Sequence, residues 1–168
     1  MNIFYLDKNP EIAAQYHCDK HCVKMILESA QLLSTAHRVL DGDKWADEQG
    51  LYKPFSPNHP SAIWTRASCE NYDYVWNLAH YLCKEYTKRY QKTHAVQKKN
   101  LLVALAVSPY NLSFNGFTPP PQCMPDQYKV DNNAVLAYQN YYHGEKAGFA
   151  QWRLGEPDWW QKEILSSA

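Results

Sequence analysis

Residues 9–40, with the sequence NPEIAAQYHCDKHCVKMILESAQLLSTAHRVL, decide the fold that this chain is expected to adopt. Asn9 can cap a helix with its side-chain oxygen, and Pro10 suits the first helical turn, where a backbone N–H has no partner. At about 100° per residue, one broad arc of such a helix is apolar. This arc contains Cys18, Cys22, Val23, Met25, Ile26, Ala30, Leu32, Leu33, Ala36 and Leu40. The pattern predicts one long amphipathic helix.

The opposite arc of the same helix is polar. It contains His17, Lys20, His21, Lys24, Glu28, Gln31, Thr35 and Arg38. A solvated helix face is the simplest interpretation, but such faces are usually built from repeated Glu and Lys. Two histidines and one glutamate among several cations are better suited to an anionic ligand or to proton transfer. We therefore expect a site on this arc, with Glu28 shielded, paired to Lys24 or Arg38 and within reach of His21.

The remaining chain also has a helical pattern, and we expect one all-α domain over residues 1–168. A short apolar arm, residues 1–7, precedes the first helix as a small strand or an extended segment. Further helices are predicted at 58–90, 94–107 and 131–143, separated by a Pro-rich coil at 108–128 and followed by an aromatic plug at 152–164. The expected fold is a helical bundle in which two long helices cross.

Composition excludes several classes of function. Seventeen basic and seventeen acidic residues cancel, which counts against a DNA-binding protein that relies on charge alone. Five cysteines without a secretory leader are expected to be reduced, buried thiols in a cytoplasmic protein. No segment approaches the ~20 apolar residues that span a bilayer, so we expect no membrane partner. No Gly-rich phosphate loop is present, and we expect no cofactor.

Two chemistries fit the polar arc. His17, His21 and Glu28 have helical metal-ligand spacing, although Cys18 stands where zinc-protease helices carry a glutamate and Lys24 would repel a cation. We predict no metal site and keep a metal-dependent helical enzyme as an alternative. The other chemistry is attack of an amine on a sugar C1′, with Glu28 stabilising the positive charge and moving protons. The amine would belong to Met1, whose ordinary pKa is roughly 8, or to Lys20 or Lys24.

Several motifs together resemble the phage pyrimidine-dimer DNA glycosylases with AP-lyase activity, the endonuclease V-type family. That family has a short N-terminal arm and a long helix in which a histidine precedes the catalytic glutamate by seven residues, as His21 precedes Glu28 here. Its second long helix ends in a basic step, to which Lys88-Arg89-Tyr90 is similar. Its C-terminal segment resembles Glu145-Lys146 followed by Pro157-Asp158-Trp159-Trp160, and Asn58-His59-Pro60 resembles a motif of cellular members.

The resemblance implies a DNA-repair enzyme, both hydrolase and lyase, that acts on the N-glycosidic bond of a damaged or modified pyrimidine. Because Asn2 normally keeps Met1 in place, the expected catalytic residues are Glu28, Met1 and Lys24. DNA or a nucleotide is the expected partner, and a non-enzymatic module that binds a nucleotide or a protein is the alternative. The expected substrate-binding residues are His17, Lys20, His21, Gln31, Arg38, Asn58, His59, Trp64 and Arg66.

Overall fold

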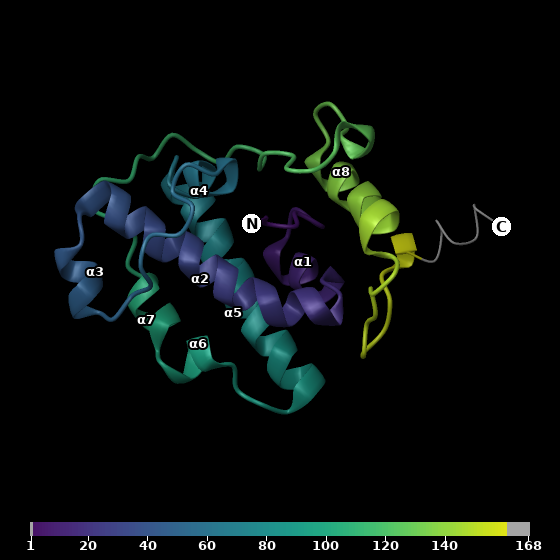
Figure 1. Cartoon of the computed structure of the whole chain (residues 1–168), viewed down its shortest axis with the longest axis horizontal. Helices are drawn as coiled ribbons and strands as arrows, with labels where there is room; N and C mark the ends of the chain where they lie inside the picture. Colours follow the sequence, from purple (N-terminus) through teal and green to yellow (C-terminus); the bar gives the residue numbers. More distant parts are fainter. Residues whose placement is uncertain (1, 161–168) are drawn as a thin grey trace.

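The computed structural model describes residues 2–160 of the chain, and every regular element in that part is helical. The predicted all-α class is confirmed. Figure 1 shows two long helices crossing at the centre, with shorter helices around them. The α-helices are α1 (Pro10–Tyr16), α2 (Asp19–Asp41), α3 (Lys44–Glu48), α4 (Pro60–Thr65), α5 (Cys69–Tyr90), α6 (Ala95–Lys98), α7 (Leu101–Leu105) and α8 (Ala134–Tyr141). A 3₁₀ turn, η1 (Asp126–Tyr128), precedes α8, and a π-helical turn, η2 (Tyr142–Lys146), follows it.

The core lies where α2 crosses α5. Ile26 and Leu33 of α2 and Val75 and Leu82 of α5 are fully buried, and the arm before α1 packs against them with Leu6 at 0% exposure. Complete burial of one such side chain contributes about 1.5–3 kcal/mol. The apolar arcs predicted for these two helices therefore face each other. The predicted arm is confirmed as a non-helical segment over residues 2–7, although Phe4 within it has a left-handed φ of +53° rather than an extended backbone.

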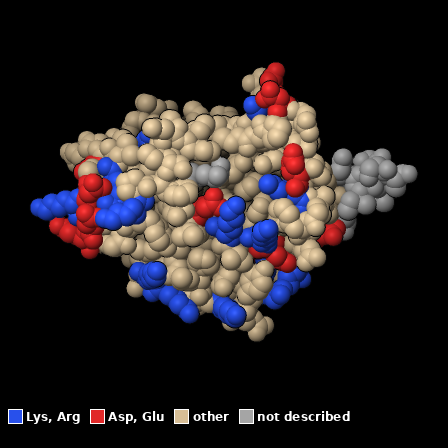
Figure 2. Space-filling view, viewed as in Figure 1, with Lys and Arg blue, Asp and Glu red and all other residues tan. Residues whose placement is uncertain are grey.

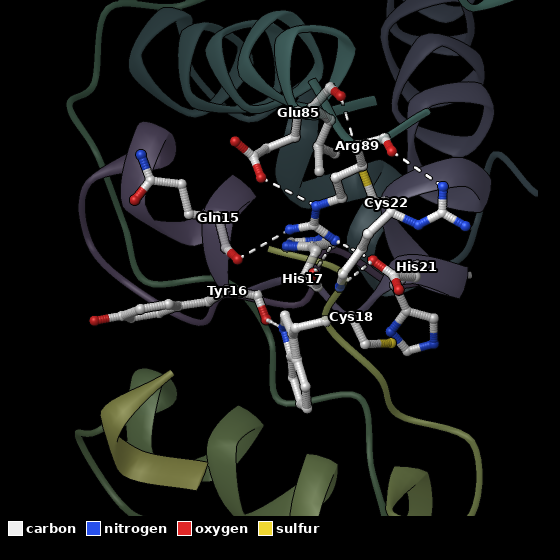
Figure 3. Close-up of polar contacts among 12 residues, drawn as sticks. Gln15, Tyr16, His17, Cys18, His21, Cys22, Glu85 and Arg89 are labelled. Atoms are coloured by element: carbon white, nitrogen blue, oxygen red, sulfur yellow. Dashed lines mark hydrogen bonds and ion pairs between the residues drawn. The ribbon is translucent and has the colours of Figure 1, made fainter. Parts of the chain in front are cut away.

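The first predicted helix is wrong in one respect, because residues 9–40 form two helices rather than one. Asn9 and Pro10 begin α1 as predicted, but His17 and Cys18 have extended backbones with ψ of 129° and 162°. Buried Arg89 of α5 holds this break, donating to the carbonyl oxygens of His17 and Gln15 at 2.8 and 3.0 Å. Figure 3 shows the Arg89 guanidinium between Glu85 on one side and Gln15 and His17 on the other. The arginine thus replaces the hydrogen bonds that an unbroken helix would make at this point.

The other predicted helices are also interrupted. Residues 58–90 divide into α4 and α5 at 66–68, where Ser68 caps α5 by accepting from the Asn71 N–H at 3.1 Å. Residues 94–107 divide into α6 and α7 at Asn100, which has a φ of +57°. Between the first two predicted helices, residues 44–48 form the short helix α3.

The Pro-rich coil is largely confirmed, and it crosses the molecule from α7 to η1 as Figure 1 shows. The last helix begins later than predicted, because Asn133 rather than Asp131 caps α8. It continues beyond the predicted end at residue 143 as the π-helical turn η2, which includes Gly144. Trp152 and Trp160 of the predicted plug are buried, and residues 161–164 lie outside the described part. Among residues 2–160, no helix combines the length and apolarity needed to cross a bilayer.

Gly144 permits a close approach between η2 and the ring of Tyr128. A Cβ atom at position 144 would overlap Cε1, Cζ and Oη of that ring, so Gly144→Ala is expected to lower the free energy of unfolding by about 1–3 kcal/mol. Urea denaturation measures this loss. Gly148→Ala is the matched control, since a Cβ there meets nothing within 4 Å. Equal stability of the two variants would contradict the close packing of Tyr128 on η2.

Candidate functional site

A pocket of about 370 Å³ lies where the N-terminal arm, α2 and η2 meet. We call it the carboxylate pocket. It gathers side chains from distant parts of the chain, most of them polar. Its lining residues are Asn2, Phe4, Lys24, Glu28, His59, Cys123, Tyr141 and Lys146.

Glu28 supplies the carboxylate of this pocket and is only 9% exposed. Lys24 lies one turn earlier on α2, and its Nζ is 3.7 Å from Oε2 of Glu28. The Lys24 side chain is 61% exposed, so the pair connects the pocket to solvent. The predicted shielding of Glu28 and its pairing with Lys24 are therefore confirmed. An acid held beside an amine in a partly dry site is suited to proton transfer.

The N-terminal arm reaches this pocket with Asn2 and Phe4. The Asn2 side chain donates from Nδ2 to the carbonyl oxygen of Cys123 at 2.9 Å and accepts the Ile3 N–H at 3.0 Å. Met1, the predicted nucleophile, lies outside the described residues. Asn2 thus fixes the arm to Cys123, which also lines the pocket.

Lys146 adds a second lysine to the pocket. Its Nζ lies 4.6 Å from the centre of the Tyr141 ring and 5.9 Å from that of Phe4, at distances typical of cation–π contact. The sequence singled out this lysine only as part of a Glu-Lys pair. Its place in the pocket depends on η2, because a π-helical turn changes which side chains share a face. Helical periodicity alone therefore could not have assigned it.

The two histidines of the polar arc, His17 and His21, are buried rather than solvated. His21 stacks on Phe4 at 4.2 Å between ring centres, and its Nδ1 lies 2.7 Å from the Tyr142 hydroxyl. Burial, followed by the charges of His17 and nearby lysines, lowers the pKa of His21 to about 3. His21 is neutral at pH 7 and supports Phe4, which lines the pocket.

His17 belongs to the break between α1 and α2, so it does not share a helix face with His21. Its Nδ1 lies 2.7 Å from the carbonyl oxygen of Ala13, and burial is the main cause that lowers its pKa to about 4. Within residues 2–160, no three His, Cys, Asp or Glu side chains are grouped as metal ligands, so His17, His21 and Glu28 are not assembled as such a set.

His59 is the one residue of the Asn58-His59-Pro60 triplet that lines the pocket. It caps α4, where its Nδ1 accepts the Ser61 N–H at 3.0 Å. Burial, and then the charge of the chain's amino terminus, lowers its pKa. The neutral ring is therefore favoured, and it forms the wall facing the arm.

The other predicted binding residues do not line the carboxylate pocket. Arg38 is buried and bonds to Asp43, Asp47 and the carbonyl oxygens of Leu51 and Tyr52. Lys20 lies over the Phe149 ring, at 4.5 Å from its centre. The remaining four, Gln31, Asn58, Trp64 and Arg66, are also absent from the lining. Arg38 is thus engaged in the fold, and its prediction as a substrate-binding residue is not supported by its position.

Cysteine chemistry differs from the expectation in one detail. All five cysteines are free thiols, as predicted, but Cys69 and Cys123 are half-buried rather than buried. Cys123 lines the carboxylate pocket, and its Sγ lies 3.7 Å from the Ser61 hydroxyl.

The charges on this face of the molecule are mixed. Figure 2 shows basic and acidic side chains intermingled near the centre of the face and further basic side chains along the lower edge. The face drawn in Figure 2 therefore carries both signs of charge, consistent with the equal totals of the sequence. No family model, curated protein or solved structure matches this chain.

Proposed function

We propose that the protein is an amine-dependent enzyme that cleaves the N-glycosidic bond of a damaged or modified pyrimidine nucleotide in DNA, with glycosylase and AP-lyase activity. One observation carries the proposal: Glu28 shares the carboxylate pocket with Asn2, the neighbour of the terminal amine, and with Lys24. An acid beside an amine is the minimum that imine chemistry at a sugar requires.

In the proposed reaction the amine attacks C1′ of the deoxyribose. The bond from C1′ to the pyrimidine breaks, and the base leaves with the electron pair and takes up a proton. Opening of the ring at O4′ then gives a protonated imine between C1′ and the amine. Removal of a C2′ proton expels the 3′-phosphate, and water hydrolyses the imine to release the amine.

Each side chain of the pocket has a role in this sequence. The Glu28 carboxylate stabilises the positive sugar and moves protons at O4′ and C2′. Lys146 and the exposed end of Lys24 offset the charge of a phosphate group. Phe4 and Tyr141 provide aromatic surface beside the reacting sugar. The terminal amine is the first candidate for the nucleophile, and the Lys24 amine is the second.

Borohydride trapping tests the proposal, because it reduces an imine to a stable secondary amine. We expect a covalent adduct between the protein and an oligonucleotide that carries an abasic site or a modified pyrimidine. Peptide mapping is expected to place the adduct on Met1 or on Lys24. Addition of one residue before Met1 moves the terminal amine and is expected to abolish the adduct if that amine is the nucleophile.

Lys20→Ala is the matched control for Lys24→Ala. Both lysines belong to the same helix, but the Lys20 side chain lies over Phe149 and outside the carboxylate pocket. Trapping should therefore survive the change at position 20. The proposal fails if no adduct forms on any damaged or modified substrate, or if the adduct maps to a lysine remote from the pocket.

A further inference from the structure

The Pro-rich coil presents an aromatic side chain, Phe117, to solvent. Its ring is 44% exposed, and its inner face packs on three other rings. The ring centres of Tyr5, Trp64 and Tyr74 lie 6.1, 5.8 and 5.8 Å from that of Phe117. An exposed ring with this backing is a rigid surface rather than a loose loop side chain.

Hydrogen bonds to α4 and α5 fix the backbone around Phe117. The Gly116 N–H donates to Glu70 Oε1 at 2.9 Å, and the Thr118 N–H donates to Asn71 Oδ1 at 3.0 Å. The Trp64 indole N–H donates to the Thr118 carbonyl oxygen at 2.9 Å. Gly116 itself has a φ of +94°, which a residue with a Cβ rarely adopts. A ligand that stacks on Phe117 would therefore find the ring already ordered, which reduces the entropic cost of binding.

A cavity of about 420 Å³ lies beside this ring. We call it the Phe117 cavity. Its chemistry combines an aromatic face, side-chain amides that both donate and accept hydrogen bonds, and one ammonium group. The lining includes Tyr5, Lys8, Phe117, Pro119, Asn132 and Asn133. A nucleobase offers a flat face and polar edges, and its phosphate offers a negative charge, so a nucleotide matches all three features.

The N-terminal arm connects this cavity to the carboxylate pocket. Phe4 lines the carboxylate pocket, whereas the next residue, Tyr5, lines the Phe117 cavity. We propose that the Phe117 cavity binds the base of the nucleotide adjacent to the one whose sugar enters the carboxylate pocket, with that base stacked on Phe117. This inference rests on the proposed function and gives it a substrate class, a strand whose bases are unpaired at this point. A paired base keeps its faces covered by its neighbours and cannot stack on a side chain.

The neutral surface agrees with such a substrate. A protein without net positive charge gains little from contact with many phosphates, so stacking has to provide a larger share of the affinity. Stacking on a side chain also tolerates any base, because every base has a π face. The affinity for a single-stranded oligonucleotide is therefore expected to fall more on substitution of Phe117 than on a rise in ionic strength.

The test uses the whole protein and a single-stranded oligonucleotide with 2-aminopurine next to an abasic site. Phe117→Leu is expected to weaken binding about tenfold and to remove the quenching of 2-aminopurine fluorescence by the protein. Phe117→Tyr keeps an aromatic face and is expected to retain both. The matched control is Phe114→Leu, because Phe114 belongs to the same coil, is 84% exposed and does not line the cavity.

Binding and trapping are scored separately, so the two proposals fail in different ways. Unchanged affinity and quenching in Phe117→Leu, with the wild-type adduct still formed, would overturn the inference and leave the proposed function standing. If the wild-type protein forms no adduct but its binding still depends on Phe117, the proposed glycosylase and lyase activity is wrong and the stacking site stands. Equal weakening by Phe114→Leu and Phe117→Leu would also overturn the inference, since it would reflect a general effect on the coil.

Discussion

Glu28→Gln is expected to lower the rate of imine formation by about a hundredfold or more, the usual contribution of a general acid or base. Glutamine has the same shape as glutamate but cannot carry the charge or accept a proton at neutral pH. Single-turnover borohydride trapping on an abasic oligonucleotide measures the rate. Although Glu28 is only 9% exposed, glutamine fills nearly the same volume, so the fold should remain intact by circular dichroism.

Glu48→Gln is the matched control for this prediction. Glu48 ends the short helix α3, is exposed and lies outside the carboxylate pocket. The same chemical change there should leave the rate within experimental error. If Glu28→Gln forms the adduct at the wild-type rate, the carboxylate has no part in imine formation.

The interiors of the long helices could be predicted from the sequence, because burial follows the apolar period of a helix. The apolar positions predicted for the segment that became α2 include Met25, Ile26 and Leu33, and all three are buried. Asn9 as a cap and Pro10 in the first turn of α1 are also correct, because both act on backbone groups within four residues. Local chemistry therefore predicted helix type and several helix starts.

The break between α1 and α2 could not be predicted in this way. The carbonyl oxygens of three consecutive residues at the break accept hydrogen bonds from distant side chains, Gln15 and His17 from Arg89 and Tyr16 from the Trp152 indole. No pattern within residues 9–40 specifies partners at positions 89 and 152. Because of the break, His17 does not lie on the polar arc and is buried beside Arg89.

The candidate site shows the same division. Glu28, Lys24 and His59 were singled out from local motifs, and all three line the carboxylate pocket. The arm residue Phe4 and Lys146 of η2 complete the lining, but only tertiary packing places them there. Arg38 was predicted to bind the substrate because it belongs to the polar arc. In the structure it pairs instead with Asp43 and Asp47, which follow α2.

Acidification is expected to destabilise the protein steeply between about pH 6 and pH 4, because His17 and His21 are buried as neutral rings. Their pKa values are lowered, chiefly by burial, to about 4 and about 3 in the folded protein, against an ordinary value near 6.5 for an unfolded chain. The unfolded state therefore binds more protons throughout this window, and the free energy of unfolding falls as pH falls. Stability from these groups is present above pH 6.5 and is lost towards the folded pKa values.

The slope of the free energy of unfolding against pH measures how many protons these two histidines take up on unfolding. Each one contributes up to about 1.4 kcal/mol per pH unit, so the pair contributes up to about 2.7 kcal/mol per pH unit in urea denaturation between pH 6 and pH 4.5. His21→Gln should reduce the slope by close to one proton, whatever it does to stability at pH 7. His80→Gln is the comparison variant, because burial also lowers the pKa of this half-buried ring but by less, so its substitution should reduce the slope by less. Carboxyl groups that titrate in this range are common to both variants and cancel. A slope unchanged by His21→Gln would mean that this ring is charged in the folded protein, and the stacking of a neutral His21 beneath Phe4 would then be wrong.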